Sequence, residues 1–273
     1  MSTKYIFIDI DGTLLSHTTG IPDSAKEAIG LARANGHKVF INTGRVKSAV
    51  DAIIRSMPFD GMVYAAGAHV EINEKTLVEH QLDPEDLERL IELFEDEEVG
   101  YVLEGSSISY YNEKAIAFFN KRMENKQLLK PQVSRHLVQE NMVAPLANYF
   151  ARPTTINKCS VFADNNDQIY RLEEALDDKF QFIIYDENHS GEIILRGIDK
   201  SYGIRKVLEH FGADMIDAMA LGDSMNDYEM VKAAGAGVAM GNAHDRLKAV
   251  ADYVTFDVDD AGLFHALKYY KVI

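Results

Sequence analysis

The chain alternates short apolar runs with segments whose apolar residues recur at helical spacing. The apolar runs of the first third are Tyr5–Ile8, Val39–Ile41 and Met62–Ala65. Runs this short, bounded by polar residues, predict buried strands. A helix is expected between Pro22 and Gly36, and a second one, with Val50, Ile53 and Ile54, is expected after Arg45. This order of strands and helices predicts an α/β fold with a doubly wound parallel sheet.

The pattern changes near Leu82 and becomes a mixture of helices and hairpins. A helix with one apolar face begins at Pro84. The further elements predicted here are strands at Gly100–Leu103, Ser107–Tyr111, Ile156–Phe162 and Phe180–Tyr185, and helices at Lys114–Met123 and Asp167–Leu176. Residues 127–153 show no clear pattern. The mixture predicts an α+β domain inserted into the α/β core.

The first pattern returns near the end of the chain. The elements expected there are strands at Glu192–Leu195, Ala218–Leu221 and Gly237–Met240, and a helix at Tyr202–Phe211. We therefore divide the chain into a first core part (1–82), an inserted cap domain (83–188) and a second core part (189–273).

Candidate chemistry begins where the first strand ends, at Asp9-Ile10-Asp11-Gly12-Thr13. Ligands of open α/β sheets bind beyond the carboxyl ends of the strands. Two carboxylates this close repel each other unless a cation neutralises them. Gly12 permits a sharp turn, and Thr13 offers a hydroxyl. The alternative is an Asp-rich turn that only closes the strand.

Three later segments also place polar residues at element boundaries. Thr43-Gly44-Arg45 lies at a predicted helix N-terminus, where backbone N–H groups bind phosphate. Lys200 begins a helix, and the segment 222–227 with Asp223, Asn226 and Asp227 follows a strand. Taken singly, Thr43 could cap its helix, Lys200 could be a surface lysine, and the acids could be loop residues. Four such segments, each at a boundary, favour one shared site.

Composition narrows the class of protein. The net charge of −15 argues against a partner that is nucleic acid or an anionic membrane. The single cysteine, Cys159, excludes an intramolecular disulfide. No apolar run reaches about 18 residues, so no transmembrane helix is expected. The N-terminus passes into the first strand without a signal segment, so a cytoplasmic location is expected.

The four segments together resemble the ordered motifs of haloacid dehalogenase-superfamily phosphatases. Asp9–Thr13 matches the first motif, Thr43 the second, Lys200 the third and segment 222–227 the fourth. The inserted domain between the second and third motifs resembles the large α/β (C2B-type) cap of the Cof type. Two positions differ from many relatives. Ala66-Gly67-Ala68 stands in place of Asn-Gly-Ala, and Lys200 is followed by serine instead of glycine.

The resemblance implies a mechanism for this chain. Asp9 would be the nucleophile that forms an aspartyl-phosphate, and Asp11 the general acid and base. Mg²⁺ would bind the Asp9 carboxylate, the Asp11 backbone carbonyl and Asp223. The residues implied to bind the phosphoryl group are Ile10, Thr43, Gly44, Lys200 and Asn226. Asp227 would support the metal site or Lys200 without touching the substrate.

The implied substrate is a small phosphorylated metabolite, either a sugar phosphate or a phosphorylated cofactor. Asp11 favours phosphate chemistry, because a halide leaves without a proton. The candidate substrate contacts in the cap are Tyr110, Tyr111, Arg135, His136 and Lys158. A phosphomutase and a non-catalytic protein that binds a phosphometabolite are the alternatives. The oligomeric state is left open.

Overall fold

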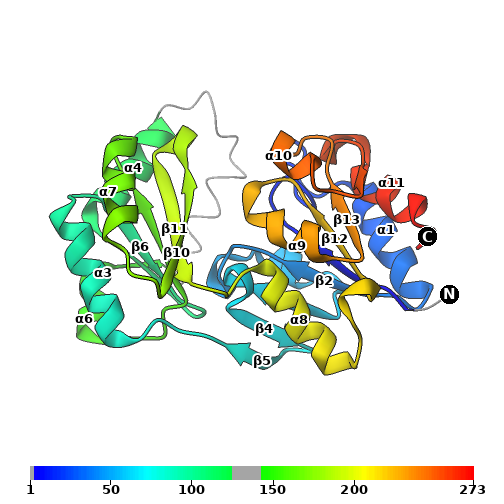
Figure 1. Cartoon of the computed structure of the whole chain (residues 1–273), viewed down its shortest axis with the longest axis horizontal. Coiled ribbons are helices and arrows are strands. Elements are labelled where there is room, and N and C mark those ends of the chain that lie inside the picture. The colour runs from blue at the N-terminus through cyan, green and yellow to red at the C-terminus, as the bar shows by residue number, and fades with distance from the viewer. Residues whose placement is uncertain (1–2, 125–142) are drawn as a thin grey trace. The chain divides into compact units, whose positions relative to one another are not determined.

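The computed structural model describes residues 3–124 and 143–273 (Figure 1). The chain forms two compact units. The first comprises Met1–Gly44, Asp51–Glu79 and Ile198–Ile273, and the second comprises Arg45–Val50 and His80–Gly197. Each unit has its own sheet and its own hydrophobic core.

The sheet of the first unit is α/β in character, as the sequence predicts. Its strands are β1 (Tyr5–Ile8), β2 (Lys38–Asn42), β3 (Gly61–Tyr64), β4 (His69–Ile72), β5 (Lys75–Glu79), β12 (Ala218–Gly222), β13 (Ala236–Ala239) and β14 (Tyr253–Val254). Within the described residues they form eight strands in the order β14-β13-β12-β1-β2-β3-β4-β5. The pairs from β14 to β3 are parallel. The antiparallel strands β4 and β5 extend this sheet and were not predicted.

Helices cover both faces of the first sheet. They are α1 (Asp23–Ala34), α2 (Ala52–Arg55), α8 (Lys200–Phe211), α9 (Tyr228–Ala233), α10 (Asp245–Lys248) and α11 (Gly262–Tyr269). Phe7 on β1 belongs to a core cluster with residues of α8 and α9, and its ring stacks on Phe40 at 5.1 Å between centroids. Ile6 and Ile8 point to the opposite face and are also fully buried. A strand buried on both faces is typical of a parallel sheet.

The second unit is an α+β module. Its strands are β6 (Gly100–Glu104), β7 (Ser109–Tyr111), β8 (Val143–Pro145), β9 (Lys158–Phe162), β10 (Phe180–Tyr185) and β11 (Ser190–Leu195). Within the described residues the sheet order is β10-β11-β9-β6-β7-β8. The helices are α3 (Pro84–Asp96), α4 (Glu113–Glu124), α6 (Leu146–Ala151) and α7 (Asn166–Ala175). Leu90 and Phe94 of α3 share a core cluster with Tyr101 and Leu103 of β6.

The strand expected at Glu192–Leu195 forms, but it belongs to the second unit and not to the parallel core. It is β11, and it pairs antiparallel with β10 and β9. A three-residue 3₁₀ turn at Asp186–Asn188 and the left-handed His189 join β10 to β11 as a hairpin. The sequence of a short apolar strand does not indicate which sheet the strand joins. Here the hairpin with β10 places β11 in the second sheet. The chain returns to the first unit at Ile198.

The helix predicted after Arg45, with Val50, Ile53 and Ile54, is confirmed only at Ile53 and Ile54. A 3₁₀ turn covers Lys47–Ala49, Val50 is extended, and α2 has only four residues. The Ser48 hydroxyl donates to the Gly105 carbonyl at 2.9 Å within the second unit. The buried Val50 and this tertiary contact override the helical pattern.

Gly67 packs closely against the backbone of Asp199 in the first unit, and substitution can test this packing. Gly67 has φ +104°, and a Cβ there would overlap the backbone carbonyl of Asp199. Gly36 has a similar φ of +87° but open space around its Cα. We expect Gly67→Ala to lower the free energy of unfolding by about 3 kcal/mol, because left-handed strain and overpacking add. Gly36→Ala should cost only about 1–2 kcal/mol, from strain alone.

Urea unfolding of the two variants measures this difference. Equal losses for Gly67→Ala and Gly36→Ala would contradict the close packing of Gly67 against Asp199.

Candidate active site

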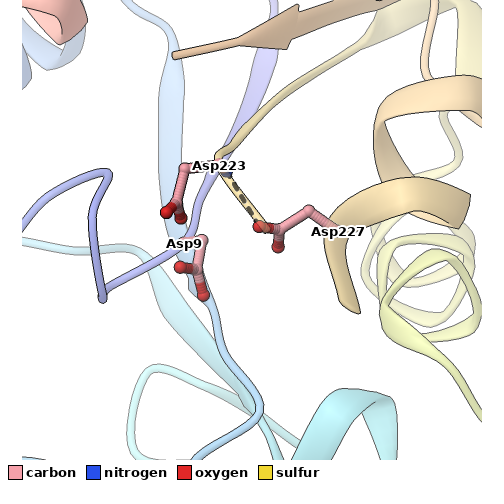
Figure 2. A group of neighbouring side chains, drawn as sticks. All are labelled: Asp9, Asp223 and Asp227. Atoms are coloured by element: carbon pink, nitrogen blue, oxygen red, sulfur yellow. Dashed lines mark hydrogen bonds between the residues drawn. The ribbon is translucent and has the colours of Figure 1, made fainter. Parts of the chain in front are cut away.

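Parallel pairing brings two acidic segments together at the carboxyl ends of neighbouring strands. Asp9 follows β1, and Asp223 follows β12, with Ile8 opposite Leu221 in the register. The Asp9 N–H continues the ladder by donating to the Leu221 carbonyl at 3.1 Å. Carboxylate oxygens of Asp9, Asp223 and Asp227 lie within 4.8 Å of one another (Figure 2). Residues from the two ends of the chain thus form one acidic cluster.

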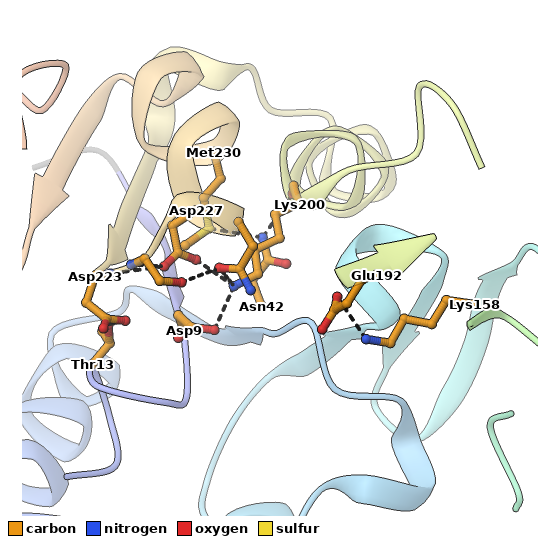
Figure 3. A network of polar contacts seen from close by, with 11 residues as sticks. Asp9, Thr13, Asn42, Lys158, Glu192, Lys200, Asp223, Asp227 and Met230 are labelled. Carbon is orange, nitrogen blue, oxygen red and sulfur yellow. Dashed lines mark hydrogen bonds and ion pairs between the residues drawn. The ribbon is translucent and has the colours of Figure 1, made fainter. Parts of the chain in front are cut away.

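A single buried ammonium group lies among these acids. Lys200, the first residue of α8, is fully buried. Its Nζ lies 2.7 Å from Asp9 Oδ1 and 2.5 Å from Asp227 Oδ1 (Figure 3). The Asn42 amide donates to the Lys200 carbonyl at 2.9 Å and so ties the start of α8 to the end of β2. The alternative that Lys200 is an exposed surface lysine is wrong.

Asp227 organises the loop that carries Asp223. Its Oδ1 pairs with Lys200, and its Oδ2 accepts the backbone N–H groups of Asp223 and Ser224, both at 3.0 Å. Asp227 is fully buried, and a Cβ at Gly222 would overlap its carboxylate. Because both of its oxygens already accept hydrogen bonds, Asp227 orients its neighbours.

The loop after β1 packs tightly against Asp223. Gly12 has φ +80°, and a Cβ there would overlap the Asp223 carboxylate. The Thr13 hydroxyl donates to Asp223 Oδ1 at 3.3 Å. Gly12 therefore meets two requirements, a left-handed turn and the close approach of a carboxylate.

Electrostatics at this site favour a cation. Burial raises the pKa of Asp9 well above its usual range, and neighbouring carboxylates raise it further, while the Lys200 ammonium lowers it. Burial and the Asp227 carboxylate raise the pKa of Asp223 to about 7. Although burial lowers the pKa of Lys200, Asp227 and Asp9 raise it above its usual value. In this cluster the three carboxylates of Asp9, Asp223 and Asp227 surround the one ammonium group of Lys200.

The donor set fits a hard divalent cation. Carboxylate oxygens suit Mg²⁺, Ca²⁺ or Mn²⁺. A cation would stabilise the ionised forms of Asp9 and Asp223, which burial and the neighbouring carboxylates disfavour by raising the pKa of both groups. Asp9 and Asp223 are the residues of this cluster that could hold the ion, since Asp227 is already engaged.

The other predicted site residues lie on segments that neighbour the cluster. Thr43 follows β2, which pairs with β1, and it is buried. Its N–H donates to the Val63 carbonyl, and it begins no helix, so the helix-cap alternative and the predicted helix N-terminus at Thr43–Arg45 are both wrong. Asn226 lies in the 3₁₀ turn Met225–Asp227, with Oδ1 at 3.3 Å from Lys200 Nζ.

The candidate residues of the second unit have structural partners there. The buried Tyr110 hydroxyl lies 3.1 Å from the Thr154 hydroxyl, and Tyr111 packs edge-on against Phe119. Lys158 pairs with two carboxylates of the same sheet, Glu192 at 2.9 Å (Figure 3) and Glu104 at 3.5 Å. Arg135 and His136 lie outside the described residues. Substrate contact by these five side chains stays a prediction.

Two asparagines at the site escaped the sequence analysis. Asn42 was visible as the polar residue that ends a buried strand directly before Thr43. Asn242, whose Nδ2 donates to the Gly12 carbonyl at 2.9 Å, gave no signal beyond its place after a predicted strand. No helix in the described ranges combines the length and hydrophobicity that a bilayer span needs.

The first unit is an α/β sheet with carboxylates and a buried lysine beyond its central strands. The second unit is inserted into it as an α+β module. This combination is typical of phosphoryl-transfer enzymes, whose ligands bind at this edge of the sheet. The family model described as haloacid dehalogenase-like hydrolase matches residues 6–267, and the chain belongs to this family. Within it the chain is a phosphatase of the Cof type.

Named relatives and solved structures agree with this family. The chain is 29% identical over 271 residues to 5-amino-6-(5-phospho-D-ribitylamino)uracil phosphatase YcsE of Bacillus subtilis (strain 168), covering 98% of this chain and 95% of that protein. The HAD subclass IIB sugar phosphatase BT4131 superposes with a TM-score of 0.81 at 25% identity, over 99% and 100% of the two chains. BT1666 from Bacteroides thetaiotaomicron superposes with a TM-score of 0.84 at 25% identity, over 99% and 96%.

Removal of the buried ammonium tests the charge balance of the cluster. In the absence of divalent metal, we expect Lys200→Met to lower the free energy of unfolding by about 3–5 kcal/mol, because Asp9 and Asp227 lose their buried partner. Lys26→Met is the control, since Lys26 pairs with Asp23 at the surface. It should cost at most about 1 kcal/mol. Denaturant unfolding that gives both variants the same stability would contradict this account.

Proposed function

We propose that this phosphatase depends on Mg²⁺ and hydrolyses a small phosphorylated metabolite through an aspartyl-phosphate on Asp9. The observation that carries the proposal is the position of the Asp9 carboxylate, which lies at the carboxyl end of β1 with Lys200 Nζ at 2.7 Å and the Asp223 carboxylate beside it. A nucleophilic carboxylate needs to be ionised, and Lys200 favours that form.

In the first step, an Asp9 oxygen forms a bond to phosphorus, and the bond from phosphorus to the leaving oxygen breaks. Asp11 donates a proton to that leaving oxygen. It then removes a proton from the water that attacks the aspartyl-phosphate, which releases phosphate and restores Asp9. Asp9 and Asp11 both lie in the segment that follows the end of β1, and we assign them to opposite ends of the bond that breaks.

Mg²⁺ is the cation that we assign to the acidic cluster. The Asp9 and Asp223 carboxylates and the Asp11 backbone carbonyl would hold it, and when bound it lets an anionic phosphate approach the anionic Asp9. Asp227 stays in a supporting role, because its oxygens accept from Lys200, Asp223 and Ser224.

The phosphoryl oxygens would be bound by groups around this cluster. The assigned residues are Ile10, Thr43, Gly44, Lys200 and Asn226. Asn226 Oδ1 accepts from the Ser224 hydroxyl at 2.7 Å and faces Lys200, so its amide nitrogen is the end that can donate to phosphate. Such donors stabilise charge as it shifts during phosphoryl transfer.

The names of two relatives support a proposal for the substrate class. BT4131 is named a sugar phosphatase, and YcsE is named for 5-amino-6-(5-phospho-D-ribitylamino)uracil. We propose a sugar phosphate or a phosphorylated cofactor for this chain. The second unit would act as the cap that excludes water and selects the substrate.

The nucleophile is tested by its amide variant. Asp9→Asn should lower kcat for the best of a panel of sugar phosphates and phosphorylated cofactors by at least roughly 10³-fold, because an amide oxygen is a poor nucleophile. Asp23→Asn, at an exposed helix end, is the control and should keep full activity. Phosphate release by the Asp9 variant at more than a tenth of the wild-type rate would refute the assignment.

The metal site is tested without substrate. We expect Mg²⁺ at about 100 times its Kd to stabilise the wild type by about 2.7 kcal/mol. Thermal unfolding with Mg²⁺ and with EDTA measures this as a rise in Tm. In Asp223→Asn the rise should largely disappear, because one carboxylate ligand is lost. No Mg²⁺ effect on the wild-type Tm would contradict the proposed site.

A further inference from the structure

A short segment after β13 contacts both loops that carry the acidic cluster. The Met240 N–H donates to the Gly222 carbonyl at 3.0 Å, and the His244 N–H donates to the Asp223 carbonyl at 2.9 Å. Between them, Asn242 Nδ2 donates to the Gly12 carbonyl at 2.9 Å. Segment 240–244 therefore fixes the loop after β1 relative to the loop after β12.

Both polar atoms of the Asn242 side-chain amide form hydrogen bonds. Its Oδ1 accepts the Val258 N–H at 3.1 Å, at the start of the 3₁₀ turn Val258–Asp260. A flipped amide would place oxygen against the Gly12 carbonyl and nitrogen against the Val258 N–H, so the orientation is fixed. The same turn holds the outer part of the loop, because Asp259 accepts the hydroxyls of Thr18 at 2.8 Å and Thr19 at 2.6 Å.

Gly12 is the point at which this support matters most. Its N–H donates to the Leu15 carbonyl at 2.9 Å, which fixes the peptide plane that contains the Asp11 carbonyl. Asn242 fixes the following peptide plane through the Gly12 carbonyl. Without that second bond, Gly12 would be freer to rotate about its ψ angle. Rotation would shift the loop after β1 relative to Asp223, on which Gly12 packs, and so change the distance between the Asp11 carbonyl and the Asp223 carboxylate.

We propose that Asn242 is a positioning residue for the cation site of this phosphatase. It holds the Asp11 carbonyl and the Asp223 carboxylate in the arrangement that binds Mg²⁺, and it touches neither substrate nor metal itself. The inference rests on the proposed function, because it takes Asp11 and Asp223 as metal ligands. A group that orients ligands contributes about 10-fold or more to metal affinity.

The test is the Kd of Mg²⁺ measured by isothermal titration calorimetry on the whole protein without substrate. Asn242→Ala should raise this Kd about 10-fold. The KM for substrate at saturating Mg²⁺ should stay within about twofold of the wild-type value, because no substrate contact is lost.

Asn35→Ala is the matched control. Asn35 also donates its Nδ2 to a distant backbone carbonyl of the first unit, that of Val272 at 2.8 Å, but away from the acidic cluster. It should lower Tm and leave the Kd of Mg²⁺ unchanged. An equal Kd in Asn242→Ala and Asn35→Ala would overturn the inference, since a purely structural role lowers stability in both variants.

If Asn242→Ala does not fold, the Kd of Mg²⁺ is measured on Asn242→Asp instead. The carboxylate keeps the size of the side chain and the bond to the Val258 N–H, but it cannot donate to the Gly12 carbonyl. We expect weaker Mg²⁺ binding even though a negative charge is added. Binding as tight as wild type, or tighter, would overturn the inference.

The activity of Asp9→Asn distinguishes a failure of the proposed function from a failure of the inference about Asn242. If this variant keeps its activity, the proposed function fails, whereas the inference, which concerns the metal ligands Asp11 and Asp223, is decided by the Kd of Mg²⁺ in Asn242→Ala. If Asp9→Asn is inactive while Asn242→Ala binds Mg²⁺ normally, the inference alone fails.

Discussion

The Lys200 ammonium group, buried between Asp9 and Asp227, is the interaction on which the site depends. A buried charge is costly unless it is paired, so the ammonium group needs both carboxylates and each carboxylate needs the ammonium group. They come from the end of β1, the start of α8 and the 3₁₀ turn after β12. The ion pairs therefore tie three distant parts of the chain to one edge of the sheet.

The same arrangement leaves the site short of positive charge. Lys200 pairs directly with Asp9 and Asp227, whereas Asp223 adds a third carboxylate nearby. Burial and the neighbouring Asp227 carboxylate raise the pKa of Asp223 to about 7. Folding thus maintains a destabilised acidic cluster that a cation would stabilise. A buried cluster of like charges is typical of functional sites, because a sequence selected for stability alone would not retain it.

The sequence predicted the parallel core well because its signals are local. Buried strands such as β1 and β12 end in polar residues, and parallel order alone places those ends together. The failures have tertiary causes. β11 joins the second sheet through a hairpin that its apolar pattern cannot reveal, and Ser48 breaks the expected helix by bonding to Gly105. Asn242 was missed because its role depends on contacts with Gly12 and Val258, which are remote in sequence.

The most direct measurement is identification of the residue that carries the phosphoryl group during turnover. The enzyme would be quenched in acid during steady-state hydrolysis of its best substrate, and its peptides would then be mapped by mass spectrometry. The account predicts a phosphoryl group on the peptide that contains Asp9, at the Asp9 carboxylate. A phosphoryl group on another residue, or turnover by direct attack of water with no phosphoenzyme, would contradict it.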